Sequence, residues 1–187
     1  MVKKRYCGIT PEGELLITGL EIKRSDWCLL AKEIQYYVIE KILTGTTEKE
    51  INDYLKKVKK EMDTYPVEKF IFEKVVDTRK HMKVRTTLVK VWENLGNKVN
   101  KIYGDRVEYQ FVSPHGETLL GVRWIYDDRG NIIAIPEDIP IEKIRNKIGY
   151  NYYWKKQIIP VVKRVIQAIG WKIGEQQKTL DGNLLYV

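Results

Sequence analysis

Apolar and polar residues alternate with two different periods along this chain, and each change of period marks a new element. Residues 5–10 and 14–22 have the alternation of strands, and Pro11-Glu12-Gly13 between them supplies a turn with a glycine suited to positive φ. Helical spacing follows over residues 27–43, with Ser25 as the expected N-cap and Gly45 as the end. The pattern therefore predicts a β-hairpin at residues 4–22 and then a long helix.

A second helix is expected to begin at the capping box Thr47-Glu48-Lys49-Glu50 and to end at Pro66. Apolar side chains recur along one face of this helix, at Ile51, Tyr54, Leu55, Val58 and Met62. Lysines occupy the remaining surface, at Lys56, Lys57, Lys59 and Lys60. We expect this lysine face to be solvated rather than to contact DNA, because charged faces of this kind are common on surface helices.

Shorter elements are predicted in the second half of the chain. Residues 70–76 suggest a strand, residues 87–95 a helix that stops at Gly96, and residues 107–111 and 119–126 a small antiparallel sheet. Two helical stretches follow at residues 141–148 and 152–170, and Pro160 should kink the second. The expected fold class is α+β, with a mainly helical domain and a small antiparallel sheet preceded by a β-hairpin.

Composition adds a preference for a polyanionic partner. The 187 residues include 33 Lys and Arg against 25 Asp and Glu, which gives a formal net charge of +8 and a pI near 9.3. An excess of this sign favours binding to an extended polyanion such as nucleic acid.

Neither a membrane segment nor a metal site is expected in this chain. No apolar run approaches the roughly 20 residues needed to cross a bilayer. Met1 leads directly into Val2-Lys3-Lys4-Arg5 with no apolar signal segment, so we expect a cytoplasmic protein. Cys7, Cys28, His81 and His115 match no zinc spacing, and both thiols are expected to be small core residues.

Two sequence blocks resemble family B DNA polymerases of the archaeal type. The first comprises Lys3-Lys4-Arg5-Tyr6, the turn at Pro11-Glu12-Gly13, Gly19-Leu20-Glu21 and Arg24-Ser25-Asp26-Trp27. It is similar to the segment where the palm of these enzymes hands over to the thumb, just after the second catalytic aspartate motif. The second block, with Tyr152-Tyr153, Gln157, Pro160 and Ile169-Gly170-Trp171, resembles the last thumb helix. Members usually carry an acidic residue where this chain has Gly149.

The resemblance implies three segments: a palm-edge hairpin at residues 1–24, a thumb at residues 25–174 and a tail at residues 175–187. Because Met1 stands immediately before the Lys-Lys-Arg-Tyr motif, we expect a polymerase split between two polypeptides, of which this chain is the small subunit. A large polymerase subunit would then supply the catalytic aspartates and Mg²⁺. This chain would contribute no catalytic residue, metal ligand or cofactor, and its hairpin would complete the partner's palm sheet.

Primer-template double-stranded DNA is the ligand that the resemblance implies. Lys3, Lys4, Arg5 and Tyr6 are expected to reach the minor groove and phosphates near the primer end, where base-pair acceptors are similar for every correct pair. Arg24 is expected to open the first thumb helix and, by the same resemblance, to lie near the duplex backbone. From composition alone, a basic N-terminal arm without a fixed partner and an ordinary surface arginine remain open.

A second set of DNA contacts is expected in the basic loop at residues 79–86, which precedes a helix. Lys83, Arg85 and Thr86 are its candidate phosphate-binding residues. A solvated loop is the alternative.

The tail resembles the short peptide by which archaeal replicative polymerases bind a sliding clamp. Gln177, Leu180 and Leu184 have the spacing of its glutamine and apolar anchors, although Asn183 stands where an aromatic residue is usual. A chance match in a polar tail is the alternative.

Two other function classes compete with the split polymerase. A free-standing basic duplex-binding protein would use the same cations without a polymerase partner. An autonomous nuclease ranks last, because no Asp, Glu and His cluster appears at metal-binding spacing.

Overall fold

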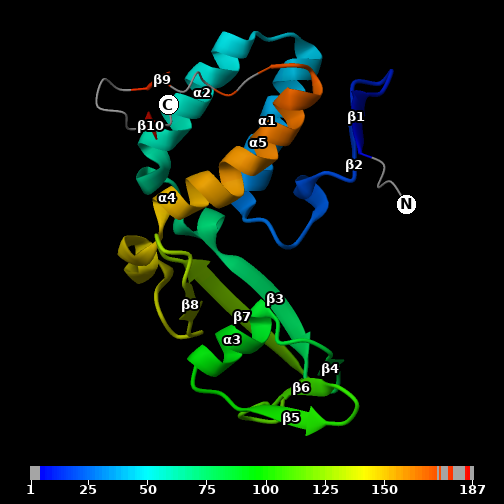
Figure 1. Cartoon of the computed structure of the whole chain (residues 1–187), viewed down its shortest axis with the longest axis vertical. Helices are drawn as coiled ribbons and strands as arrows, with labels where there is room; N and C mark the ends of the chain where they lie inside the picture. Colours follow the sequence, from blue (N-terminus) through cyan, green and yellow to red (C-terminus); the bar gives the residue numbers. More distant parts are fainter. Residues whose placement is uncertain (1–4, 172, 174–176, 179–183, 186–187) are drawn as a thin grey trace. The chain divides into compact units, whose positions relative to one another are not determined.

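In the described part of the chain, five α-helices and four small antiparallel sheets form the α+β fold that the pattern predicts (Figure 1). The computed structural model describes residues 5–171, 173, 177–178 and 184–185. Contacts divide the chain into two compact units. Unit 1 comprises residues 1–66 and 153–187, and unit 2 comprises residues 67–152.

Unit 1 starts with the predicted hairpin. Strands β1 (Tyr6–Ile9) and β2 (Leu15–Thr18) pair antiparallel, and Gly13 has φ 87° in the turn. The second strand is shorter than predicted, because Gly19 turns the chain with φ 73° and the 3₁₀ turn η1 (Glu21–Lys23) follows. Ile17 of β2 is buried and packs with Leu20 and Ile39.

Helix α1 (Leu29–Thr44) ends at Gly45 with φ 98°, as predicted, but its beginning differs from the prediction. Cys28, not Ser25, is the N-cap residue. The backbone N–H of Cys28 donates to Oε1 of Gln157 over 3.0 Å, so a side chain distant in sequence satisfies it. The helix therefore begins beyond Ser25, and the N–H at its start is satisfied by a tertiary contact instead of a local cap.

Helix α2 (Glu48–Glu61) begins at the predicted capping box. Thr47 accepts from the N–H of Glu50, whose carboxylate accepts from the N–H of Thr47 in return. Ile51, Leu55 and Val58 are buried along its inner face. A 3₁₀ turn, η2 (Met62–Thr64), follows it before Pro66.

The last helical stretch changes its winding twice. Helix α4 (Tyr150–Tyr153) passes into the π-helical segment η5 (Trp154–Ile158), in which the N–H of Ile159 bonds to the carbonyl of Trp154. Helix α5 (Ile159–Ala168) then carries Pro160 in its first turn, where a missing N–H costs no helical bond. A π turn ahead of Pro160 thus replaces the simple kink that was predicted.

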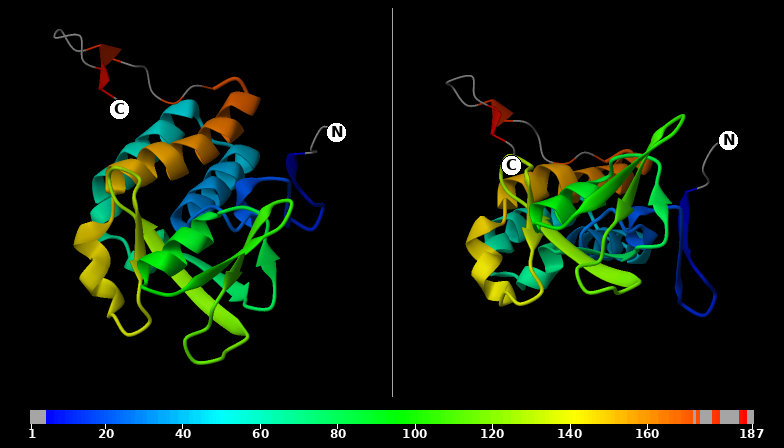
Figure 2. Two further views of the ribbon diagram at one scale, coloured as in Figure 1. Left: turned by 60° about the horizontal axis from the view of Figure 1, so that its bottom comes forward. Right: turned by 90° about the horizontal axis from the view of Figure 1, so that it is seen from below.

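Apolar packing joins the helices of unit 1. Helices α1 and α5 lie side by side in both views, together with α2 (Figures 1 and 2). Val38 and Ile39 of α1 and Val161 and Val162 of α5 are fully buried. On α2, the ring of Tyr54 lies 4.1 Å from that of Tyr37, centroid to centroid.

A three-stranded sheet with one helix on it forms the core of unit 2. Strand β7 (Leu119–Tyr126) lies between β3 (Phe72–Asp77) and β8 (Ile132–Ile135), and helix α3 (Thr87–Asn94) packs against β7 and β8. Phe72 lies opposite Trp124, and their rings stack with centroids 5.5 Å apart. Sequence analysis predicted a single small sheet in this region, whereas unit 2 contains two.

The second sheet of unit 2 has the strand order β4-β6-β5. Its strands are β4 (His81–Met82), β5 (Val99–Tyr103) and β6 (Val107–Phe111). Other turns of unit 2 are 3₁₀: η3 (Val67–Phe70) and η4 (Ile141–Lys147), the second of which was predicted as a helix. In the tail, β9 (Gln177–Lys178) pairs with β10 (Leu184–Leu185).

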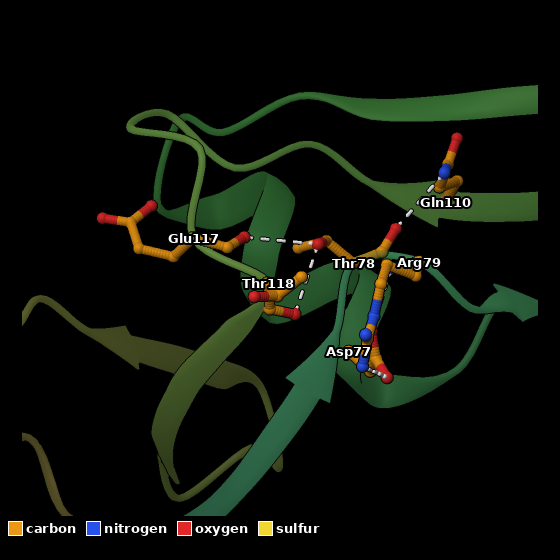
Figure 3. A network of polar contacts seen from close by, with 6 residues as sticks. All are labelled: Asp77, Thr78, Arg79, Gln110, Glu117 and Thr118. Atoms are coloured by element: carbon orange, nitrogen blue, oxygen red, sulfur yellow. Dashed lines mark hydrogen bonds and ion pairs between the residues drawn. The ribbon is translucent and has the colours of Figure 1, made fainter.

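Polar contacts at Thr78 connect the two sheets of unit 2 (Figure 3). The hydroxyl of Thr78, which follows β3, lies 3.2 Å from the carbonyl oxygens of Glu117 and Thr118. Its own carbonyl accepts from the amide of Gln110 in β6 over 3.2 Å. The end of β3 is therefore fixed to both β6 and the segment before β7.

Gly149 has a structural reason to be glycine. Its N–H donates to the carbonyl of Tyr126 over 2.8 Å, and a Cβ atom at this position would lie 2.1 Å from the carbonyl carbon of Asp127. No larger residue fits such a close approach of two backbones. The departure from the family pattern at this position is thus explained by packing within unit 2.

Candidate nucleic-acid interface

The hairpin presents its predicted DNA-binding residues at an exposed end. Arg5 is exposed directly before β1, and Tyr6 is 50% exposed. Lys3 and Lys4 lie outside the described residues. Tyr6 faces Thr18 across the hairpin and Gly8 faces Leu16, so Tyr6 and Leu16, which is 48% exposed, share one face.

A buried polar cluster holds the segment between the hairpin and α1. Glu21 and Gln35 are fully buried, and the amide of Gln35 donates to the Glu21 carboxylate over 2.8 Å and to the carbonyl of Val161 over 3.0 Å. Arg164 of α5 pairs with the same carboxylate and lies over the ring of Trp27, 5.7 Å from its centroid. We call Glu21, Gln35 and Arg164 the clasp.

The clasp fixes the direction in which the hairpin leaves the helices. Oε1 of Gln35 also accepts from the backbone N–H of Ile22 over 3.2 Å, so this one side chain bonds to η1 and to α5. A buried carboxylate is tolerated only where it is paired and hydrogen-bonded, which restricts the cluster to a single arrangement. The exposed residues of the hairpin are therefore carried on a rigid base.

Arg24 does not open the first helix, contrary to expectation. It follows η1, and its guanidinium forms two hydrogen bonds to the carboxylate of Asp26, at 2.6 and 3.0 Å. The pair is about half exposed. A phosphate can approach this guanidinium from solvent, but it has to compete with Asp26 for the same N–H groups.

Both arginines of the basic loop have carboxylate partners. Arg79 forms hydrogen bonds of 2.9 Å to both carboxylate oxygens of Asp77, and they lower the pKa of Asp77 to about 2. Arg85 pairs with Glu93 over 2.5 Å. Thr86 is the N-cap residue of α3, but its hydroxyl lies 3.6 Å from the sulfur of Met82 instead of capping the helix.

Lys83 is exposed and lines a hollow of about 440 Å³ at the end of the β5–β6 ribbon. Arg106 lines the same hollow, together with Asp105 and Glu108. Glu108 in turn bonds to Nδ1 of His81 over 3.0 Å. Sequence reasoning missed Arg106, although residues 79–106 contain eight Lys or Arg against two acidic residues and could have indicated a larger basic region.

Almost the whole of this chain matches a family of known proteins. The model of DNA polymerase family B matches residues 1–169. The chain belongs to this family.

Individual relatives are archaeal DNA polymerases and are much longer. A DNA polymerase of Archaeoglobus fulgidus is 32% identical over 197 residues, which cover 96% of this chain and 24% of the relative. One from Thermococcus kodakarensis is 31% identical over 176 residues, with 92% and 10% covered. The solved family B DNA polymerase of Pyrobaculum calidifontis shares the fold, with a TM-score of 0.58 and 24% identity over 92% of this chain and 21% of its own. This chain therefore spans a quarter or less of the length of these relatives.

The family B resemblance distributes its candidate residues over both units. Arg5, Tyr6 and Arg24 lie in unit 1, whereas Lys83, Arg85 and Thr86 lie in unit 2. Within each unit the cations are exposed rather than gathered in a cleft. An open arrangement of this kind suits a long, regular backbone more than a small ligand.

The lysines of α2 form the solvated face that was expected. Lys56, Lys57 and Lys60 are exposed, and the ammonium of Lys59 lies 5.7 Å from the centroid of the Trp154 ring. Their role towards DNA stays untested.

The two cysteines of this family B chain differ in exposure. Cys28 is buried, which raises the pKa of its thiol to about 12, but Cys7 is exposed, so the expectation of two core thiols was wrong for Cys7.

No three His, Cys, Asp or Glu side chains among the described residues are placed to hold a metal ion. Of the tail residues, Gln177 and Leu184 belong to β9 and β10, and Leu180 lies outside the described residues.

No helix in the described parts of the chain is both long and apolar enough to span a bilayer.

Proposed function

We propose that this chain is the small subunit of a split family B DNA-directed DNA polymerase. It grips the primer-template duplex through the minor groove and phosphates, while a large polymerase subunit supplies the catalytic aspartates and Mg²⁺. The chain alone is then inactive as a polymerase, and its activity belongs to the assembly of two polypeptides.

The hairpin is the observation that carries this proposal. It is a sheet of only two strands in the described structure, so each strand has one edge whose backbone groups lack a neighbouring strand. Tyr6, Ile9 and Leu16 leave apolar surface exposed on it, with 50%, 44% and 48% exposure. A short ribbon with open edges and an apolar surface is marginal in water and suits addition to a larger sheet. The palm sheet of the large subunit is the partner that family membership suggests.

Grip on DNA would come from cations spread along the chain. Arg5 and Tyr6 lie beside the proposed sheet junction, and Lys3 and Lys4 precede them in sequence. Arg24, Lys83, Arg85 and Thr86 would contact further phosphates. If about five phosphates are neutralised, the logarithm of the affinity should fall against the logarithm of salt concentration with a slope of roughly −4 to −5.

Metal chemistry is assigned to the large subunit. In this proposal the Mg²⁺ ligands and the nucleotide-transfer step belong to the large subunit. The side chains of this chain bind and orient the duplex next to the primer end.

Primer extension by the reconstituted assembly tests the proposal. The proposed large subunit is to be sought as a polymerase encoded beside this chain. It is then assayed with and without this chain on a primed template, under conditions that limit each enzyme to one binding event. We expect this chain to increase both duplex affinity and product length. A large subunit that extends primers equally well without it would overturn the proposal.

A pair of matched variants tests the predicted minor-groove contacts. Replacing Lys3 and Lys4 by Ala should weaken duplex binding by the assembly at every sequence tested, because these contacts sense pair shape rather than base identity. Replacing Lys56 and Lys57 by Ala removes the same charge from the exposed face of α2 and serves as the control. Equal losses for the two variants would reduce the contact to general electrostatics, and a loss restricted to certain sequences would contradict shape sensing.

A free-standing duplex-binding protein is the second candidate function. The formal net charge of +8 supports it without reference to the hairpin edges. This alternative expects full duplex affinity from the chain alone and no association with a large subunit, which sedimentation of the mixture would reveal.

We also propose that the tail binds a sliding clamp through Gln177, Leu180 and Leu184. β9 and β10 pair with each other here, so a clamp would have to separate them before the peptide could form a 3₁₀ turn. Substitution of Gln177 and Leu184 by Ala should abolish binding to the clamp in a pull-down with purified components, and unchanged binding would remove the tail from the proposal.

A further inference from the structure

The β5–β6 ribbon of unit 2 has two faces of different chemistry. Tyr103 lies directly opposite Val107, and Lys101 lies opposite Tyr109. Because alternate residues of a strand share a face and directly paired residues point the same way, these four side chains form one continuous surface. We call it the ribbon face.

The ribbon face is exposed at its tip. Tyr103 is 77% exposed and Val107 is 37% exposed, while Lys101 is exposed and Tyr109 is half-buried. In the part of the chain that the structure describes, Tyr103 has no hydrogen bond, ion pair or ring contact. A free aromatic ring with an aliphatic neighbour and a cation two residues away is thus presented to solvent.

The other end of the same face is firmly anchored. Phe111 shares this face and is 2% exposed, with its ring centroid 6.0 Å from that of Trp92 in α3. The ribbon is therefore held at its Phe111 end, and its tip extends from a fixed base. Tyr103 is exposed because it lies at this tip, and the packing of the core does not require its ring.

The opposite face of the ribbon carries a balanced set of charges. The hollow at its tip is lined by the cations Lys83 and Arg106 and by the acids Asp105 and Glu108. Such a mixture favours no anion strongly, so the hollow is not the binding surface we infer.

Charge complementarity points to a polyanion. Residues 79–106, which include β4, α3, β5 and the turn after it, contain eight Lys or Arg against two acidic residues, and of these cations Arg79 and Arg85 are paired with Asp77 and Glu93. A basic surface with an exposed aromatic platform is the combination that binds nucleic-acid strands without sequence preference, since every base has an aromatic face.

We propose that the ribbon face binds single-stranded DNA, with a base stacked on Tyr103 and the adjoining phosphate at Lys101. Tyr109 lies diagonally across the ribbon from Tyr103, at a spacing of roughly 7–8 Å, and can support the next base. The unpaired template strand ahead of the primer end is the source of such bases in a polymerase. The inference goes beyond the proposed duplex grip and requires no large subunit.

Duplex DNA cannot use both parts of the ribbon face. Its bases already stack on one another, so the ring of Tyr103 has access only to backbone and groove edges. An unpaired strand offers free base faces together with the phosphates that Lys101 attracts, and both parts of the ribbon face are then used.

Fluorescence anisotropy of the full chain with a labelled oligo-dT tests the inference. Tyr103→Ala should weaken binding about tenfold or more, because stacking is lost, whereas Tyr103→Phe should bind almost like the parent chain. Tyr36→Ala removes a tyrosine that is 44% exposed on α1 of unit 1 and is the matched control. Tyr103→Phe as weak as Tyr103→Ala, or Tyr103→Ala without effect, would overturn the proposal.

An abasic oligonucleotide separates stacking from charge. It keeps the phosphates and removes the bases, so the parent chain and Tyr103→Ala should bind it equally weakly. Lys101→Ala should lower the salt slope on oligo-dT by about 0.7, the value for one phosphate contact with a single strand. A preference for duplex over oligo-dT that depends on Tyr103 would refute the inference. So would a Tyr103 effect confined to association with the large subunit, because the ribbon face would then be a protein contact. None of these outcomes depends on primer extension, so this proposal and the proposed function fail separately.

Discussion

The two β-ribbons of this protein both expose a tyrosine, but they are anchored by opposite kinds of contact. The hairpin β1–β2 presents Tyr6 and is followed by a segment held by the buried clasp of Glu21, Gln35 and Arg164. Ribbon β5–β6 presents Tyr103 and is anchored through Phe111, which packs beside Trp92.

The difference shows how each kind of contact suits the role that we propose for its ribbon. Hydrogen bonds and ion pairs inside a protein are directional, so the clasp selects one orientation of the hairpin. A strand that joins a partner's sheet in register, as we propose for the hairpin, needs that restriction. Apolar packing is non-directional and fixes only the buried end of β5–β6, which leaves the tip able to adapt to a flexible strand.

The largest expected effect comes from removing the apolar anchor. Phe111→Ala leaves a cavity beside Trp92 and should destabilise unit 2 by about 4 kcal/mol. Amide hydrogen exchange should show the loss first in β5 and β6. Val107→Ala, at the exposed end of the same strand, is the control and should change little. Full protection of β5 in Phe111→Ala would mean that the ribbon has another anchor.

Breaking the clasp should have the next largest effect. Glu21→Ala leaves Arg164 without its carboxylate and Gln35 without one acceptor, and should cost about 3 kcal/mol in urea unfolding. Glu21→Gln keeps an acceptor and should lose less. Glu40→Ala, at an exposed position of α1, is the control. If both Glu21 variants match this control in stability and in association with the large subunit, the clasp does not orient the hairpin.

Local signals explain which elements sequence reasoning could predict. Thr47 and Glu50 satisfy each other's backbone N–H groups within four residues, and Gly45 and Gly96 adopt positive φ values of 98° and 79° at the predicted helix ends. Gly13 likewise turns the predicted hairpin. In each case the residues that determine the turn or the helix end lie within a few positions of it, so the sequence pattern predicts it.

The features that could not be predicted depend on residues distant in sequence. Gln157 caps α1 at Cys28 across 129 positions, and no local pattern announces that contact. The exposed surface around Tyr103 depends on the β5–β6 register, which places Lys101 and Val107 beside it. Ion pairs such as Arg85 with Glu93 also reduced the number of free cations that the basic loop had suggested.

A smaller effect is expected at the start of α1, where Gln157 bonds to the backbone N–H of Cys28. Gln157→Leu preserves volume but leaves the N–H of Cys28 without an acceptor in a buried position, which should cost about 2 kcal/mol. Gln157→Glu retains an acceptor oxygen and should recover part of this loss. Hydrogen exchange of the first turn of α1 is the measurement. An unchanged first turn in Gln157→Leu would show that Cys28 finds another acceptor.

The smallest effect concerns pH and belongs to unit 2. Arg79 lowers the pKa of Asp77 from 3.8 to about 2 in the folded protein. Because the folded pKa is depressed, this carboxylate stabilises the fold above about pH 4 and loses its contribution as the pH falls towards about 2. Asp77→Asn should therefore narrow its stability difference from the parent chain as the solution is acidified through this window. Thermal unfolding at several pH values measures the change, and Asp53→Asn on exposed α2 is the control. A difference that stays constant from pH 5 to about pH 2 would show that Asp77 acts at the end of β3 through shape alone, without its charge.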